Sequence, residues 1–159
     1  MRTNLSSQIS LNRVSTRYYK PENTIERSVL TRFEKIPTNI YETVDEGVSC
    51  IADEIIRKVQ ERQRDGKFCT IAAGTGASLR PLFAELVRRH KEEGVSFRNV
   101  VVFNLYEYYP LTEPNNSSFN QLNELFLKQV DIDPQNVFTI DGTIPQEAVI
   151  EYCRLYEQR

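Results

Sequence analysis

The chain has 159 residues, enough for one domain with a hydrophobic core, and its 40% hydrophobic and 26% charged content is ordinary for a globular protein. A net charge of −2 gives no reason to expect a nucleic acid as partner. No apolar run is long enough to span a membrane, and the N-terminal residues do not have the pattern of a secretory h-region. The three cysteines have neither metal-ligand spacing nor the even count of a disulfide framework.

The first 35 residues differ from the rest of the chain in charge. They carry seven Lys/Arg and three Asp/Glu, whereas the remainder carries 13 basic and 19 acidic residues. We therefore interpret residues 1–35 as an N-terminal extension that docks on its own protein or on a neighbouring subunit, and residues 36–159 as the domain proper. Within these parts we expect an arm over 1–24, a helix over 22–35 and a short strand over 36–41.

A long helix and a buried strand are predicted next. Thr43 and Glu46 form a capping box, and apolar residues at helical spacing continue from it to a stop signal at Asp65-Gly66. The segment 67–73 is short and mostly apolar, which predicts a strand buried on both faces.

The alternation of strands and helices then continues. A turn over 74–78 leads into an amphipathic helix that Gly94 ends, and a continuous apolar run predicts a strand over 98–104. A long loop over 106–116 follows, and loops of this length at the carboxyl end of a strand are usually functional.

The last third of the chain repeats this pattern. Ser117 or Ser118 caps a helix, residues 136–140 form a third strand, and a second capping box over 143–146 opens a final helix.

This order predicts the α/β class, with a parallel Rossmann-like sheet and helices on both of its faces, in three layers. Three or four strands make a small sheet, and the sequence ends at Arg159 without a polar tail. We therefore expect a truncated portion of a longer protein, with a sheet edge that is either exposed or covered by another copy, and we expect a homo-oligomer.

The cysteines fall within predicted elements. Cys50 and Cys153 lie on apolar helix faces and Cys69 lies in a strand. All three are interpreted as reduced core residues of a cytoplasmic protein.

The turn from Gly74 to Ser78 is a candidate anion site. Two glycines leave the backbone amides at the start of a helix unshielded, and the hydroxyls of Thr75 and Ser78 can also donate to a phosphate. The turn lacks the Gly-Lys-Ser/Thr ending of a Walker loop and the third glycine of a dinucleotide fingerprint. The alternative is a tight strand-to-helix turn without a ligand.

The residues that end the next strand lie at the same edge of the predicted sheet. Glu107 is a candidate general base or orienting carboxylate, and a solvent-facing loop acid is the alternative. The tyrosines at 106, 108 and 109 either line a binding wall or pack the loop onto the domain. His90, the only histidine, is interpreted as a solvated residue near the end of its helix.

Together these segments resemble a known family. The chain carries Thr75-Gly76-Ala77-Ser78 at the start of a helix and Phe103-Asn104-Leu105-Tyr106-Glu107-Tyr108 after an apolar strand, followed by Val130-Asp131-Ile132 and Gly142. This pattern resembles the glucosamine-6-phosphate deaminase and isomerase family, to which the 6-phosphogluconolactonases are more distantly related. The resemblance covers roughly residues 36–159.

The resemblance implies roles for particular residues. It implies that Gly74, Thr75, Gly76, Ala77 and Ser78 hold a sugar phosphate, with Ala77 contributing backbone only. The family motif has Asp-Glu-Tyr after the second strand, where the Asp moves a proton between C1 and C2 of the sugar. Here Glu107 matches, but the position of the proton-transferring Asp is Tyr106, so these two are the candidate catalytic residues. A phenol with a pKa near ~10 is a poor general base at neutral pH.

Two functions follow as expectations. The first is a deaminase-like domain, classed with hydrolases, that converts an amino-sugar phosphate to a ketose phosphate and ammonia, although the family's Asp-Gly-His loop and further basic residues do not occur in these 159 residues. The second is a non-catalytic module that binds or senses a sugar phosphate. Neither function requires a cofactor or a metal ion, and the expected partner is a small sugar phosphate rather than a nucleic acid or a membrane.

Overall fold

The computed structural model describes residues 23–25, 28, 32 and 39–158, and it divides into two units, 1–47 and 48–159. Most of the expected arm and of the helix over 22–35 lies outside the described residues. The expected strand over 36–41 is described only from residue 39 onward, and residues 39–41 are not in a strand.

Helix α2 (Val44–Arg64) begins and ends close to where the sequence predicts. The Thr43 hydroxyl accepts the amide of Glu46 at 3.1 Å, which satisfies one of the first amides of the helix. The Glu46 carboxylate reaches back to the amide of Glu42 at 3.3 Å, one residue earlier than in a standard capping box. At the other end Gly66 has a φ of 65°, a left-handed conformation that favours glycine.

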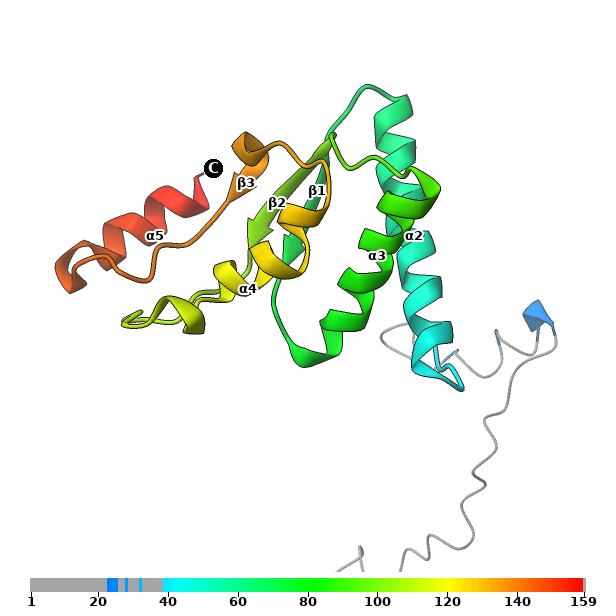
Figure 1. Cartoon of the computed structure of the whole chain (residues 1–159), viewed down its shortest axis with the longest axis horizontal. Coiled ribbons are helices and arrows are strands. Elements are labelled where there is room, and N and C mark those ends of the chain that lie inside the picture. Colours follow the sequence, from blue (N-terminus) through cyan, green and yellow to red (C-terminus); the bar gives the residue numbers. More distant parts are fainter. Residues whose placement is uncertain (1–22, 26–27, 29–31, 33–38, 159) are drawn as a thin grey trace, which may run out of the picture. The chain divides into compact units, whose positions relative to one another are not determined.

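Three parallel strands form the sheet, in the order β1 (Cys69–Ala73), β2 (Val100–Asn104) and β3 (Val137–Phe138) (Figure 1). The register pairs Ala73 with Asn104, so β1 and β2 end at the same level. The α/β class and the parallel sheet are therefore confirmed, although β3 is shorter than the predicted 136–140.

One face of the sheet carries the main hydrophobic core. The alternate residues of β2, Val100 and Val102, are buried there among apolar side chains of α2, α3 (Arg80–Glu93) and α4 (Ser118–Leu125). Phe83, Phe97 and Phe126 stack or meet edge-on within this core.

Helix α5 (Val149–Glu157) packs on the opposite face. The Tyr156 ring meets Phe103 of β2 edge-on, and its hydroxyl donates to the carbonyls of Asn104 at 3.1 Å and Phe138 at 3.2 Å. Helices therefore cover both faces, as predicted. The expected burial of the first strand on both faces is wrong, because these α5 contacts reach β2 and β3 and leave Thr70 and Ala72 of β1 exposed.

Two further predictions are corrected. The second capping box does not form, because both the amide and the hydroxyl of Thr143 donate to Asp141, and α5 follows a 3₁₀ turn, Gln146–Ala148. Cys50 and Cys153 are exposed, so the expectation that they are core residues is wrong, whereas Cys69 is partly buried and packs against the core. In α5 the tyrosines at 152 and 156 form the packed face, and Cys153 lies beside it.

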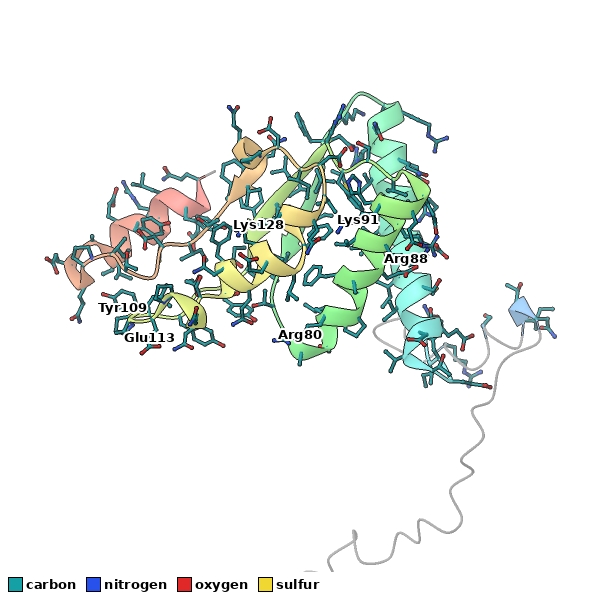
Figure 2. All side chains as sticks on the ribbon, in the orientation of Figure 1. Arg80, Arg88, Lys91, Tyr109, Glu113 and Lys128 are labelled. Atoms are coloured by element: carbon teal, nitrogen blue, oxygen red, sulfur yellow. The ribbon has the colours of Figure 1, made fainter. Side chains whose placement is uncertain are left out.

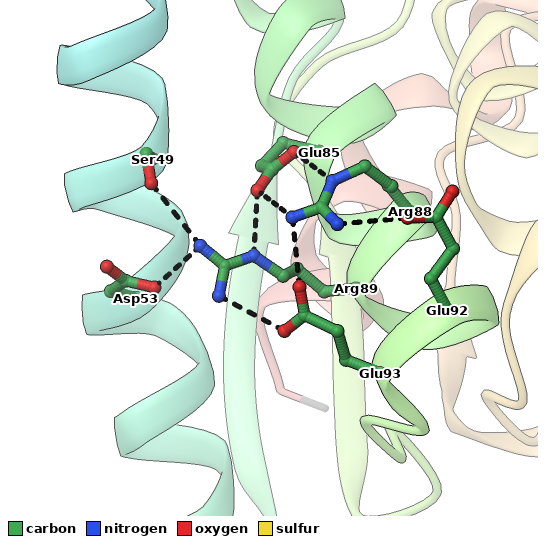
Figure 3. A network of polar contacts seen from close by, with 7 residues as sticks. All are labelled: Ser49, Asp53, Glu85, Arg88, Arg89, Glu92 and Glu93. Atoms are coloured by element: carbon green, nitrogen blue, oxygen red, sulfur yellow. Dashed lines mark hydrogen bonds and ion pairs between the residues drawn. The ribbon is translucent and has the colours of Figure 1, made fainter.

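An ion-pair cluster joins α3 to α2 (Figure 3). Glu85 accepts from Arg88 at 2.8 Å and from Arg89 at 2.7 Å, and Arg89 extends to Asp53 of α2 at 2.9 Å. Hydrogen bonds from Arg88 and then from Arg89 lower the pKa of Glu85 to about 2.

Over the described residues, no helix is both long and apolar enough to cross a membrane.

Candidate functional site

The site begins at the turn between β1 and α3. Gly74 is buried, the chain is extended at Gly76, and a single 3₁₀ turn, Ala77–Leu79, leads into α3. The first amides of a helical segment have no acceptor within it, so the amides that open this turn are available to an anion. A β-carbon added at Gly76 would approach only the Ser78 hydroxyl, at 3.6 Å, so this part of the turn is open.

Tyr106 reaches this turn from the end of β2. Its hydroxyl oxygen accepts the amide of Thr75 at 3.2 Å and lies 3.5 Å from the Thr75 hydroxyl. Both contacts lower the pKa of Tyr106 below its ordinary value of about 10, and the contact with the Thr75 hydroxyl has the larger effect. The turn and the loop after β2 are therefore brought together as the sequence predicts, and Thr75 is the residue on which they meet.

Ser118, the first residue of α4, also contacts Thr75. Their hydroxyl oxygens lie 2.9 Å apart, and Ser118 is fully buried. Because these residues are 43 positions apart, no local pattern indicates this contact. Ser118 is thus a site residue that the sequence analysis missed.

Glu107 lies behind this cluster and holds the start of α4. Its two carboxylate oxygens accept the Ser117 hydroxyl at 2.6 Å and the amides of Ser118 at 2.7 Å, Phe119 at 3.1 Å and Tyr108 at 3.0 Å. Burial raises the pKa of Glu107, but these hydrogen bonds outweigh it and leave the pKa below its ordinary value. A carboxylate with four donors is suited to orienting neighbouring groups and poorly suited to taking a proton.

Ser117 completes the junction. It is the N-cap of α4, since its hydroxyl accepts the amide of Asn120 at 3.1 Å while donating to Glu107. Of the two serines proposed from the sequence, the cap is therefore Ser117.

Asn104 ends β2 at the same edge and is almost fully buried. Its amide nitrogen donates to the carbonyl of Tyr106 at 2.9 Å, whereas its side-chain oxygen has no donor within the described part of the chain. A buried acceptor without a donor is costly, so this position favours a donor from a ligand or from another polypeptide segment.

Gly142 packs closely against the loop that follows β2. A β-carbon at this position would lie 2.3 Å from the Tyr108 carbonyl and 2.9 Å from the Leu111 side chain, so only glycine allows so close an approach. The Leu111 amide also donates to the Gly142 carbonyl at 2.7 Å.

Arg80 lies near the turn in sequence and is not considered in the sequence analysis. It is exposed at the first position of α3, two residues after Ser78, and among the described residues it makes no ion pair (Figure 2). A cation at a helix N-terminus is unfavourable next to the helix dipole, and a bound anion would offset this cost.

His90 lies near the other end of α3, about 18 Å along the axis from Ser78. Its Nδ1 bonds the Val95 carbonyl at 2.6 Å, and its side chain is half-buried rather than solvated. It is not part of the site.

Comparisons with known proteins point to one family. A family model described as glucosamine-6-phosphate isomerases/6-phosphogluconolactonase matches residues 42–159. A Bacteroides thetaiotaomicron protein named as glucosamine-6-phosphate deaminase-like is 61% identical over 160 residues, 100% of this chain and 24% of that protein. Glucosamine-6-phosphate deaminase 1 of Giardia intestinalis is 32% identical over 115 residues, 70% of this chain and 42% of that protein.

Solved structures share the fold. A monomeric glucosamine-6-phosphate deaminase is 26% identical with a TM-score of 0.65, over 74% of this chain and 47% of that one. A 6-phosphogluconolactonase from Trypanosoma brucei is 16% identical with a TM-score of 0.60, over 77% and 49% of the two chains, and this likeness shows the fold alone. The chain spans about half the length of these two structures. It spans 24% of the length of the Bacteroides protein and 42% of the length of the Giardia protein.

Proposed function

Because the chain belongs to the glucosamine-6-phosphate isomerase/6-phosphogluconolactonase family, we propose that it binds an amino-sugar phosphate at the edge of the sheet where β1 and β2 end. One observation carries the proposal. Two hydroxyls from distant segments, those of Tyr106 and Ser118, meet the turn at Thr75, so the turn lies within a polar cluster.

The phosphate is assigned to the turn. The backbone from Gly74 to Ser78 supplies amides, Thr75 and Ser78 add hydroxyls, and Arg80 supplies a positive charge at the helix start. The side-chain oxygen of Asn104, which has no donor among the described residues, supports a ligand or a further segment at the same edge.

In this proposal the described residues hold the substrate and do not transfer its proton. The Glu107 carboxylate already accepts four hydrogen bonds, so it acts as a positioning group. Tyr106 is neutral near pH 7 unless its pKa falls far below its ordinary value. The chain thereby resembles a sugar-phosphate-binding module more than a complete deaminase.

Deamination with Tyr106 as the base is the second candidate, and one observation favours it. The amide and hydroxyl of Thr75 both contact the phenol oxygen and lower its pKa, which stabilises a phenolate. If Tyr106 is the base, Tyr106→Phe abolishes ammonia release and Tyr106→Asp retains or raises it. If no ammonia is released by the wild type or by Tyr106→Asp, this candidate is excluded for the chain.

The binding proposal is tested by thermal shift. Glucosamine-6-phosphate is expected to raise the melting temperature of the 159-residue chain, whereas glucosamine at the same concentration is not. Arg80→Gln should reduce the shift, and Arg64→Gln, which removes an exposed arginine in the last turn of α2, is the matched control. Equal shifts with both sugars, or none with either, would contradict the proposal.

A cytoplasmic location and a homo-oligomeric state are also proposed. The three described cysteines form no disulfide, which supports a reducing compartment.

The hydrolase class expected from the sequence is not supported by family membership, since the family description includes isomerases as well as a lactonase.

A further inference from the structure

Tyr106 lies where the proposed phosphate would bind. Its hydroxyl oxygen accepts the Thr75 amide at 3.2 Å and lies 3.5 Å from the Thr75 hydroxyl, and both groups are assigned to the ligand in the proposed function. A phosphate oxygen that accepted the same amide would have to replace the phenol oxygen.

The ring of Tyr106 also lies close to Gly74, the first residue of the turn. A β-carbon added to Gly74 would lie 2.9 Å from Cε1 of Tyr106, which is its nearest neighbour, and the next atom of another residue is 3.8 Å away on Leu105. The absence of a side chain at Gly74 is therefore what lets this ring lie against the turn.

Tyr106 lies outside the hydrophobic core. Its side chain is 40% exposed, its ring meets Tyr108 edge-on at 6.2 Å, and it follows the last residue of β2 by two positions. Glu107, by contrast, is tied to the start of α4 and fixes the loop behind it.

We infer that Tyr106 is an intramolecular occupant of the anion site, which a ligand phosphate displaces, and that it thereby selects phosphorylated over neutral ligands. The inference rests on the proposed function. A phosphate oxygen forms a charge-assisted hydrogen bond with an amide, which is stronger than that of a phenol, whereas a sugar hydroxyl has no such advantage. Tyr106 therefore acts as a specificity-determining residue.

Tyr106→Phe tests the inference because it removes the competing oxygen and keeps the ring. Calorimetric titration with inorganic phosphate and with glucosamine-6-phosphate should show tighter binding by roughly 2- to 10-fold, the range of one net hydrogen bond. Tyr109→Phe is the matched control, since Tyr109 is exposed on the same loop and makes no hydrogen bond to the turn in the described part of the chain. Its affinity should equal that of the wild type.

Gly74→Ala provides a second route to the same outcome. The new methyl group displaces the Tyr106 ring, and Gly74 does not have a positive φ, so the backbone accepts alanine. Phosphate affinity should rise as it does for Tyr106→Phe, and circular dichroism confirms that both variants are folded.

The outcomes separate this inference from the proposed function. If the wild type binds phosphate and Tyr106→Phe binds equally or more weakly, Tyr106 is not an occupant that competes with the ligand, and the proposed function stands. If only the variants bind, a phosphate does not displace Tyr106 from the turn, and both the inference and the proposed function are wrong for the unaltered chain. If the folded wild type and both variants fail to bind, the proposed function itself is wrong.

Discussion

Glu107 joins the loop after β2 to the start of α4 through its hydrogen bonds. Its carboxylate follows β2 and accepts two amides and a hydroxyl at the start of α4, so it ties the loop to the helix that carries Ser118. Ser118 in turn contacts Thr75 of the turn. The position of the turn relative to α4 therefore depends on the charge of Glu107.

Glu107→Gln is expected to destabilise the chain by about 1–3 kcal/mol at pH 7, because an amide cannot accept all four hydrogen bonds. Since the pKa of Glu107 is lowered on folding, its contribution is present above the unfolded value of about 4.5 and is lost as the pH falls below it. Urea unfolding from pH 7 to pH 3 should show the difference between wild type and variant shrinking. Glu113→Gln, an exposed acid on the same loop, is the control.

At the scale of elements, Arg89 links α3 to α2 through an ion pair, in addition to the hydrophobic core that the two helices share. Arg89 contacts Glu85 on its own helix and both Asp53 and Ser49 on α2, whereas the ion pairs of Arg88 are all within α3 (Figure 3). The two arginines are adjacent and share Glu85, so they make a matched pair.

Arg89→Met is therefore expected to lower the melting temperature at pH 7 and low salt by more than Arg88→Met does. The pKa of Glu85 is lowered to about 2, so the stability that it gains from the arginines is present above pH 4.5 and is lost as the pH falls towards 2. Because both arginines contact Glu85, that loss reduces the effect of both variants. The difference between the variants comes from the contacts of Arg89 with α2 and should diminish in high salt. Equal melting temperatures for the two variants at pH 7 would show that the ion pair between Arg89 and Asp53 makes no measurable contribution to stability.

Elements set by local signals were predictable from the sequence. The hydroxyl of Thr43 caps α2, Gly66 ends it, and the alternation of apolar strands with amphipathic helices predicts the parallel sheet. Two contacts were not predictable from the sequence. Thr143 donates to Asp141, two residues earlier, instead of forming the expected capping box. Ser118 contacts Thr75, which is too far away in the sequence for a local pattern to indicate the pair. Arg80 belongs to no motif, so only its place at the start of α3 indicates a role.

At the scale of the whole molecule, β1 lies at one edge of the described sheet. No described strand pairs with that edge, and beside it a groove of about 570 Å³ lies between α2 and β1. Phe68 in this groove is 61% exposed. Unpaired edges with apolar neighbours favour pairing with another strand.

We accordingly expect the chain to self-associate through this edge as a dimer or larger oligomer. Phe68→Lys should shift light scattering towards the monomer, whereas Ile150→Lys, which alters a residue that is 85% exposed on α5, should not. The family does not demand association, since the related deaminase structure is described as monomeric. A wild-type chain that is monomeric at all concentrations would contradict this prediction.

The central claim is that the turn from Gly74 to Ser78 holds the phosphate of a sugar phosphate, and amide-resolved NMR tests it most directly. Titration of the ¹⁵N-labelled chain with glucosamine-6-phosphate should shift the amides of this turn and of Ser118, while glucosamine should leave them unchanged. If the turn amides stay in place while amides elsewhere shift, the phosphate binds at another position and the claim is wrong.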